Sequence, residues 1–178
     1  QRHLPQSRIT AVRFLGDDIA RDRLSPQELA GPVSRLVRWA DDYAHQYTGV
    51  YSRVDGLIRS DTPFYPAAAV REAVINAVAH RDYSIAGSQV RVFIFDNRFE
   101  VRSPGRLPNS MTLETIRFYN HESRNPLLAQ FLNRLGLMEE FGAGIPTMIR
   151  LMKEHNGTAP EFAVEGEEFV VRLFARPL

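Results

Sequence analysis

Residues 64–83 read FYPAAAVREAVINAVAHRDY, and this stretch decides how the rest of the chain can be interpreted. Pro66 suits the first turn of a helix, and the Ala, Val and Ile residues after it predict a helix buried on most of its surface. Glu72, Asn76 and His80 lie four residues apart, so their side chains form one polar stripe along the helix. The stripe places a carboxylate, which can take a proton from water, one turn from an amide oxygen suited to Mg²⁺.

The same stripe has a second interpretation, because many amphipathic helices carry Glu, Asn and His on their solvated face. Spacing alone does not separate a solvated face from a binding site. The elements predicted after the helix favour a binding site, because they supply further groups that can lie close to the stripe.

The composition of the 178-residue chain is that of a globular protein, with 44% hydrophobic and 24% charged residues. Its length fits one compact domain, alone or with a short appendage. No apolar run approaches a membrane span, so no membrane partner is expected. The sequence starts at Gln1 without a signal peptide, which suggests a piece of a longer chain. The lack of cysteine excludes disulfides and thiolate chemistry and fits a cytoplasmic protein.

The charged residues exclude two classes of nucleotide enzyme. Among 22 basic residues, Lys153 is the one lysine, and it lies in Met152-Lys153-Glu154, so the chain has no Walker A loop and no helicase motor. His80-Arg81-Asp82 is reminiscent of a kinase catalytic loop, but Gly87 stands where an Asn is needed and no Asp-Phe-Gly follows. The formal net charge of +1 does not mark the chain as a nucleic-acid binder.

A helix is predicted before the central stretch. Ser25-Pro26-Gln27-Glu28 has the pattern of a capping box with proline at the first helical position, and apolar residues follow at helical spacing. We expect this helix to run to about Tyr47. Gly31-Pro32 can shift the start of this helix to a later residue.

Alternation and turn residues predict the other elements. They are strands over 9–15, 89–95, 98–102, 161–164 and 169–175, helices over 112–119, 126–135 and 145–156, and a hairpin or extended connection over 48–61. The expected fold class is therefore α+β, a two-layer sandwich with a mixed, mostly antiparallel sheet and helices on one face.

Gly142 and Gly144 stand directly before the last predicted helix. Backbone amides and the helix dipole at such a point can receive phosphate oxygens. The alternative is a loop that needs glycine for a positive φ.

The order of these motifs resembles that of the GHKL ATPases, which include gyrase, MutL, the large heat-shock chaperones and histidine kinases. Glu72 to Ala77 is similar to their N box, Ser103-Pro104-Gly105 stands at the place of the first glycine box, and Gly142-Ala143-Gly144-Ile145 resembles the second. The similarity is greater to bacterial transcriptional regulators with a Schlafen-type AlbA-like domain, often labelled RecG-related ATP-dependent DNA helicases. The motifs shared with that branch are residues 71–73, 80–83, 103–108, 124–126 and 142–145.

This resemblance covers roughly residues 60–176 and implies a domain organisation. Residues 61–178 would form a GHKL-like ATP-binding domain. Residues 1–60 would supply a strand, a helix and a connector at the junction with an AlbA-like domain that the sequence lacks. DNA would be bound through that domain.

The resemblance also implies ATP and Mg²⁺ as cofactors and gives roles to individual residues. Asn76 would hold a Mg²⁺ that bridges the phosphates, and Glu72 would be the catalytic base for an attacking water. Gly105 would let the backbone approach the base or sugar. The segment 111–141 would form a lid, with Arg124 as a phosphate partner.

Other residues are expected at the nucleotide without a defined chemical step. Gly142, Gly144 and the Ile145 amide would cradle phosphates, and Asn125 accompanies Arg124. His80 and Asp82 are typical of the branch, although an ion pair between Arg81 and Asp82 at the helix end is an equal alternative.

Two departures from the family pattern concern adenine. Ser103 replaces the Asp that normally contacts the adenine amino group, and Leu107 replaces a glycine.

The sequence leaves three candidate functions: a nucleotide-binding regulatory module with or without slow ATP hydrolysis, a degenerate module for oligomerisation or assembly, and a DNA-binding module. A homodimer is among the expected assemblies.

Overall fold

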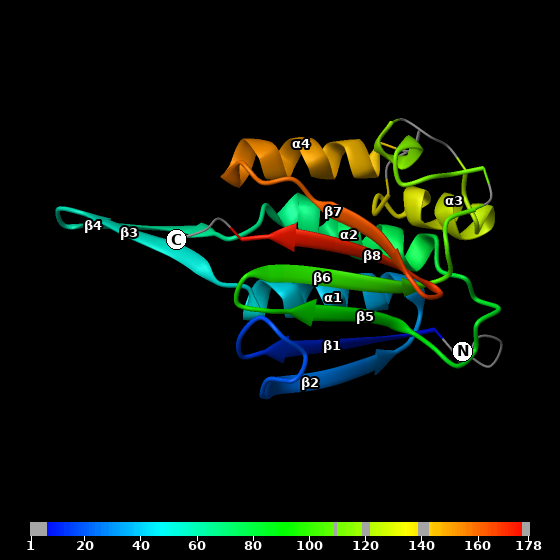
Figure 1. The fold of residues 1–178 in the computed structure, drawn as a ribbon, viewed down its shortest axis with the longest axis horizontal. Coiled ribbons are helices and arrows are strands. Elements are labelled where there is room, and N and C mark those ends of the chain that lie inside the picture. The colour runs from blue at the N-terminus through cyan, green and yellow to red at the C-terminus, as the bar shows by residue number, and fades with distance from the viewer. Residues whose placement is uncertain (1–6, 109, 119–121, 139–142, 176–178) are drawn as a thin grey trace.

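Helix α2 (Ala67–Ala79) forms from the central stretch, directly after Pro66, as predicted. We analysed a computed structural model that describes residues 7–108, 110–118, 122–138 and 143–175 (Figure 1). Nine of the thirteen α2 residues are buried, which accounts for the density of Ala, Val and Ile in this segment. The helix runs behind the central strands of a sheet, so its polar residues need partners inside the protein (Figure 1).

The main sheet has six strands in the order β2-β1-β5-β6-β8-β7. β1 and β5 are parallel, and the other neighbours are antiparallel. Their bounds are β1 Arg8–Phe14, β2 Arg23–Ala30, β5 Val90–Ile94, β6 Arg98–Pro104, β7 Glu161–Glu165 and β8 Glu168–Phe174. Strands from both sides of residue 60 therefore share one sheet.

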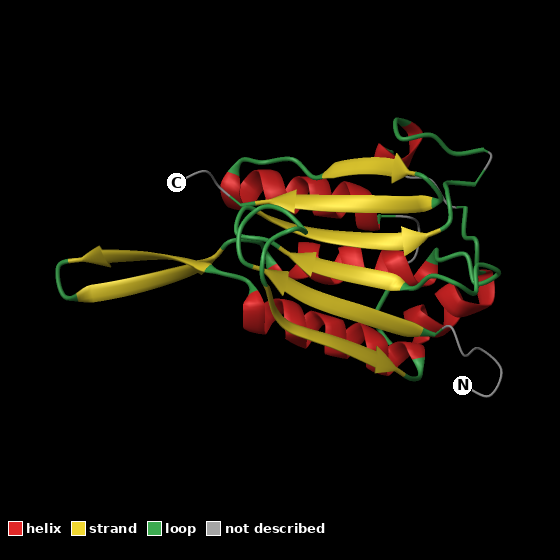
Figure 2. Ribbon diagram, turned by 60° about the horizontal axis from the view of Figure 1, so that its bottom comes forward, coloured by secondary structure: helices red, strands yellow, loops and turns green. Residues whose placement is uncertain are grey.

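Three helices cover one face of this sheet: α1 (Val33–Tyr47), α2 and α4 (Gly144–Asn156) (Figures 1 and 2). The core lies between the two layers and includes Ile9, Leu36, Ile75, Phe99, Met148 and Leu173. The expected α+β two-layer sandwich is confirmed. Within the described part of the chain, no helix is long and apolar enough to cross a membrane.

A second, two-stranded sheet projects from the body as a hairpin of β3 (Val50–Asp55) and β4 (Ile58–Pro63) (Figures 1 and 2). Its turn contains Gly56, whose positive φ of 61° suits a tight connection. Its base is bound to the C-terminal end of α4, where His155 Nε2 donates to the Pro63 carbonyl (2.7 Å) and Asn156 donates to the Phe64 carbonyl (3.2 Å). Of the two predictions for this segment, the hairpin is confirmed.

The predicted helix start at Ser25 is wrong. Residues 23–30 form β2, which pairs with β1, and α1 begins only after Gly31-Pro32. The register shifts between Ala11 and Arg13, opposite Ser25 and Pro26, and Ser25 has a φ of 49°. A proline that cannot donate is tolerated at an irregularity in an edge strand, so pairing with β1 prevails over the local capping signal.

The later helices follow the sequence more closely. α3 (Pro126–Arg134) and α4 form where they are predicted, and α4 ends at Gly157 in the left-handed conformation. The predicted helix over 112–119 is instead a 3₁₀ turn, Thr115–Arg117, and Tyr119 lies outside the described residues. The hairpins β5–β6 and β7–β8 are also confirmed.

On the face of the sheet away from the helices, Glu100 is buried among three arginines. Its carboxylate accepts hydrogen bonds from Arg98 (3.1 Å), Arg102 (2.6 Å) and Arg172 (2.8 Å). The side chain of Glu100 is only 1% exposed. Burial by itself works to raise its pKa, but the hydrogen bonds from the three arginines hold it below the ordinary value of 4.5.

Candidate functional site

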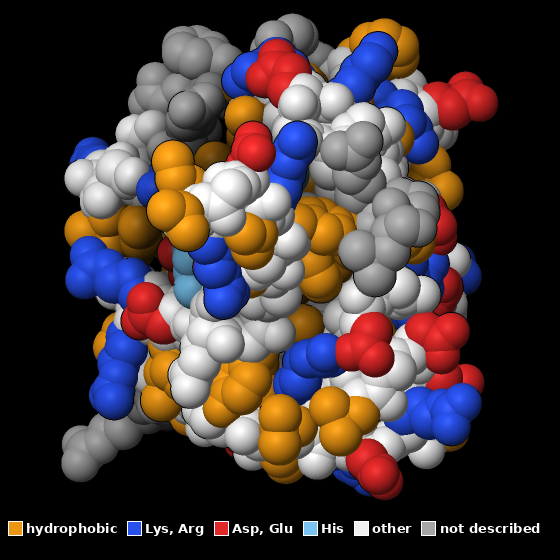
Figure 3. Space-filling model, turned by 90° about the vertical axis from the view of Figure 1, so that its left-hand side faces the viewer, with side chains coloured by type: hydrophobic (Ala, Val, Ile, Leu, Met, Phe, Trp, Pro, Cys, Tyr) orange, Lys and Arg blue, Asp and Glu red, His pale blue; other side chains and the backbone are white. Residues whose placement is uncertain are grey.

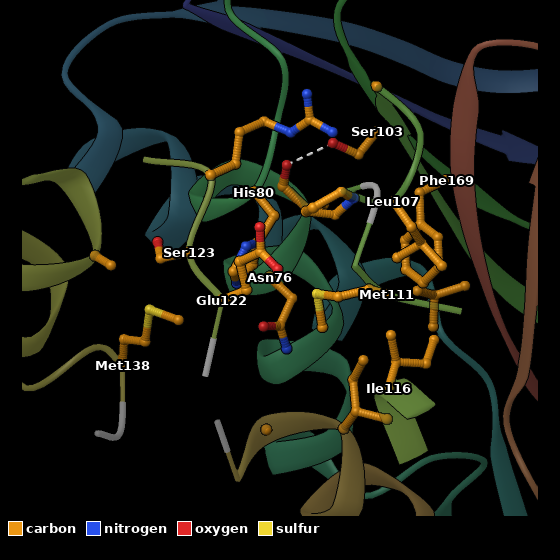
Figure 4. Close-up of a pocket in the computed structure, with 18 of the residues that line it drawn as sticks. Asn76, His80, Ser103, Leu107, Met111, Ile116, Glu122, Ser123, Met138 and Phe169 are labelled. Carbon is orange, nitrogen blue, oxygen red and sulfur yellow. Dashed lines mark hydrogen bonds between the residues drawn. The ribbon is translucent and has the colours of Figure 1, made fainter. Parts of the chain in front are cut away.

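A cavity of about 320 Å³ opens between α2, the ends of β6 and β8, the segment after β6, α3 and the start of α4. Figure 4 shows Asn76 and His80 on α2 between two walls, one with Leu107, Met111 and Phe169 and the other with Ser123 and Met138. Of the predicted site residues, those that line the cavity are Glu72, Asn76, His80, Gly105, Arg124, Gly144 and Ile145. Most of the site predicted from sequence therefore shares one space.

Glu72 and Asn76 form the polar end of this cavity. Asn76 Nδ2 donates to the Glu72 backbone carbonyl (2.9 Å) and lies 3.4 Å from Glu72 Oε2. The Glu72 side chain is buried, with 8% of the residue exposed. Because the amide nitrogen is held by its own helix, the amide oxygen of Asn76 remains as an acceptor or ligand atom.

The N-terminus of α4 lies directly against this pair. A Cβ added to Gly144 would stand 2.6 Å from Glu72 Oε2 and 2.9 Å from Asn76 Nδ2. Glycine is required here by a close approach, since the structure gives Gly144 no positive φ. The first backbone amides of α4 are thus placed beside the carboxylate and the carboxamide, and Ile145 follows in the cavity wall. Gly142 lies outside the described residues.

Side chains from other elements bind the last carbonyls of α2. Ser103 Oγ donates to the Ala77 carbonyl (2.6 Å) (Figure 4). Asn125 Nδ2 donates to the carbonyls of Ala79 (2.9 Å) and, two residues beyond the helix, of Arg81 (2.8 Å). The terminal carbonyls of a helix lack partners within the helix, so these bonds stabilise its C-terminal end. Asn125 therefore acts as a structural cap and is not among the cavity-lining residues.

Asp82 connects this helix end to Gly105 and Arg124. Its backbone amide donates to the Pro104 carbonyl (2.7 Å), and its carboxylate pairs with Arg124 Nη1 (2.8 Å). Gly105 has a φ of +110°, and a Cβ there would lie 2.7 Å from Asp82 Cβ. Hydrogen bonds from the Ser84 hydroxyl and amide lower the pKa of Asp82 below its ordinary value. Arg124 also donates to the Arg106 carbonyl, so it closes the loop against α2.

His80 lies at the C-terminal end of α2 with its ring in the cavity wall (Figure 4). Burial, and secondarily the positive charge of Arg124, lower the pKa of His80 below 6.5. The imidazole is therefore neutral at pH 7 and offers one donor and one acceptor.

Arg81 has no place in the cavity wall. It is 1% exposed, donates to the carbonyls of Ile85 and Ser88, and lies over the Tyr83 ring. Asp82 forms its ion pair with Arg124, so the structure connects Asp82 to the segment before α3. In His80-Arg81-Asp82, His80 lines the cavity, Arg81 holds the following loop, and Asp82 pairs with Arg124 of the cavity wall.

Sequence reasoning missed the apolar wall of the cavity. It is formed by Leu107, Met111, Ile116, Met138 and Phe169. Helical and strand periodicity do not identify most of these residues, because Leu107, Met111 and Met138 lie in irregular segments. Three of them, Met111, Ile116 and Met138, lie in the predicted lid between two motifs of the site, and this was the available signal.

The protein side chains at this site do not form a metal-binding centre by themselves. Among the described residues there is no group of three or more His, Asp or Glu side chains that could hold a metal ion. Asn76 supplies one neutral oxygen near one carboxylate. That set fits a Mg²⁺ held mainly by phosphate oxygens and waters.

Comparisons with known proteins bear on the family and on the fold. Residues 87–173, just under half of the chain, match the family described as "Putative ATP-dependent DNA helicase recG C-terminal". This family likeness supports an ATP-binding module. The fold resembles the crystal structure of a protein from Corynebacterium diphtheriae, with a TM-score of 0.82 and 24% sequence identity over 97% of this chain. The match spans 36% of that longer chain. No curated protein matches the chain.

Proposed function

We propose that this chain is a Mg–ATP-binding module of a bacterial transcriptional regulator, with a GHKL-like site. One observation carries the proposal: the N-terminus of α4 contacts Glu72 and Asn76 at the polar end of a cavity that also has an apolar wall. A nucleotide has the same division between a charged phosphate end and a flat apolar base. The family match over residues 87–173 supports the assignment.

Phosphates would lie at the start of α4, where the amides after Gly144 and the helix dipole favour negative charge. Asn76 would offer its amide oxygen to a Mg²⁺ bound to those phosphates. The ion would neutralise phosphate charge beside the buried carboxylate of Glu72. Arg124 would face the ligand from the segment before α3, although its bonds to Asp82 and to the Arg106 carbonyl already use both terminal nitrogens.

Hydrolysis would depend on Glu72 as general base. Its carboxylate lies within 3.4 Å of the Asn76 amide nitrogen and is screened from solvent, which suits a group that orients one water. Slow turnover is the expected regime for a regulator. DNA contact, as in the Schlafen-type AlbA-like branch, would belong to a domain outside these 178 residues.

Calorimetric titration with ATP and Mg²⁺ tests the binding site. Asn76→Ala should weaken binding at least about tenfold, equivalent to 1.4 kcal/mol, because the metal loses its protein ligand. Glu72→Gln keeps the size of the side chain, and it should retain binding while abolishing any phosphate release. A folded wild-type chain that binds no nucleotide would refute the proposal.

A non-catalytic assembly module is the second candidate, and one observation favours it. The Ser103 hydroxyl, at the place where the resembling family has Asp, donates its hydrogen to the Ala77 carbonyl. A neutral, already bonded group is a weaker partner for an adenine amino group than a free carboxylate. Self-association that is unchanged by nucleotide, together with no calorimetric signal, would support this reading.

A further inference from the structure

The projecting hairpin β3–β4 has unusual exposure for a folded segment. Val54 is 69% exposed, Leu57 104% and Ile58 73%. Eleven of the twelve strand residues are exposed, and Tyr51 is half-buried because its ring packs on Phe64. A two-stranded hairpin without a covering layer is only marginally stable in water. The tip of this hairpin therefore presents an apolar surface and open strand edges.

The two edges of the hairpin are not equivalent. On β4, Arg59 donates to Asp61 (2.9 Å) and Ser52 donates to Asp61 (2.6 Å), so the charges of that strand are used within the hairpin. β4 also ends at Pro63, which cannot donate to another strand. On β3, the described residues provide no ion pair for Arg53 or Asp55. The edge of β3 is thus the one whose charged side chains are not used within the hairpin.

The sequence of β3 is complementary to itself. It contains Arg53-Val54-Asp55, so two antiparallel copies paired about Val54 would place Arg53 of each chain opposite Asp55 of the other. The backbone agrees with this register. A two-residue turn joins the paired residues Asp55 and Ile58, so these two residues form a hydrogen-bonded pair. Hydrogen-bonded and non-hydrogen-bonded pairs alternate along an antiparallel ladder, so the N–H and C=O groups of Val54 point away from β4. Leu57 of each copy would then lie opposite Tyr51 of the other.

We propose that the β3 edge is a homodimerisation surface, and that two copies of this chain pair antiparallel about Val54 into a four-stranded sheet. A two-fold axis requires one patch that complements itself, and Arg-Val-Asp has this property. The hairpin carries two Arg and two Asp and therefore has no net charge, which disfavours nucleic acid as the partner. Figure 3, from the side on which the hairpin projects, shows basic and acidic side chains interspersed.

Sedimentation equilibrium of the purified chain is the first test. The wild type should dimerise with a dissociation constant of about 100 µM or tighter, as expected for a small interface. Arg53→Asp places like charges opposite each other and should weaken the dimer at least about tenfold. The double variant Arg53→Asp/Asp55→Arg restores the pairing of opposite charges and should recover affinity to within about threefold of wild type.

A cysteine placed at the axis gives a second readout. The chain has no cysteine, so Val54→Cys introduces one thiol at the predicted two-fold axis. Opposed residues of a hydrogen-bonded antiparallel pair have Cα atoms about 5.5 Å apart, within disulfide range. Under mild oxidation Val54→Cys should form a disulfide-linked dimer, whereas Ser60→Cys, at the middle of β4, should not.

Three results would overturn the proposal. They are a wild type that stays monomeric up to about 500 µM, cross-linking through Ser60→Cys in preference to Val54→Cys, and a double charge swap no better than the single one. None of these substitutions contacts the cavity. Nucleotide binding can therefore succeed or fail independently of this test.

Discussion

Gly144 lies so close to Glu72 that a methyl group on its α-carbon would come within 2.6 Å of the carboxylate oxygen. The absence of a side chain at this position lets the start of α4 approach the buried carboxylate without displacing it. Gly144→Ala should therefore push α4 away from Glu72 and Asn76. We expect nucleotide affinity to fall at least about tenfold, with a loss of stability of about 1–3 kcal/mol from overpacking.

Gly87→Ala is the matched control for this change. A Cβ at Gly87 would meet no atom within 4 Å, and Gly87 has no positive φ. Calorimetry should give the same affinity for Gly87→Ala as for the wild type. Equal binding by Gly144→Ala would show that the phosphate end of the ligand lies elsewhere.

Asn125→Ala should destabilise the fold, because it leaves the carbonyls of Ala79 and Arg81 without their donor. Each lost bond costs about 1 kcal/mol or more when the carbonyl stays buried, so we expect about 2 kcal/mol in urea denaturation. Asn125→Asp should cost at least as much, since a carboxylate cannot donate. Gln130→Ala, at an exposed position of the same helix, should change stability by less than about 0.5 kcal/mol.

His80 should titrate below pH 6.5, because burial and Arg124 disfavour its charged form. Above this pH, His80 is neutral in both the folded and the unfolded state, so the free energy of unfolding does not depend on its protonation. As the pH falls below 6.5, the unfolded state takes up a proton that the folded state resists, so stability decreases toward the lower folded pKa.

NMR titration of the imidazole checks this prediction. Arg124→Gln should raise the pKa of His80, since it removes the neighbouring positive charge. The pKa should still stay below 6.5, because burial is the larger cause. A His80 that titrates at 6.5 or above in the wild type would contradict the neutral state assigned to the site.

Glu100→Gln should cost about 3 kcal/mol or more, because it leaves Arg98, Arg102 and Arg172 without their shared carboxylate. The folded pKa of Glu100 lies below 4.5, so its contribution is present above pH 4.5 and is lost as the pH falls through the folded pKa. In the variant, thermal unfolding should lose part of its acid dependence.

An exposed glutamate serves as the control for Glu100. Glu154 pairs with Arg150 (2.9 Å) one turn away, and both side chains are about 60% exposed. Glu154→Gln should cost less than about 0.5 kcal/mol. Similar losses for the two variants would mean that the Glu100 cluster contributes little.

The sequence predicts those parts of the molecule in which local pattern and tertiary packing agree. α2 is apolar on nearly every side, and its one polar stripe is the part that meets the cavity, so Glu72, Asn76 and His80 were identifiable from spacing. The turns of β3–β4 and β7–β8 and the C-terminal end of α4 carry glycine, which local rules recognise.

The sequence-based predictions fail where pairing between distant segments determines the structure. Ser25-Pro26-Gln27-Glu28 has a helix-capping pattern, yet β1 offers these residues a strand partner. The role of Ser103 depends on the Ala77 carbonyl 26 residues away, and that of Asp82 on Arg124 42 residues away. No local rule connects such positions.

The two ends of α4 give the molecule a mechanical property. Its first residue, Gly144, contacts Glu72 and Asn76, and its last turn holds the root of the projecting hairpin through His155 and Asn156. Thirteen helical residues make a stiff rod about 20 Å long. A ligand that displaced the start of α4 would therefore also displace the root of the projecting hairpin. In that case hairpin pairing and ligand binding would be coupled, by the same factor in both directions.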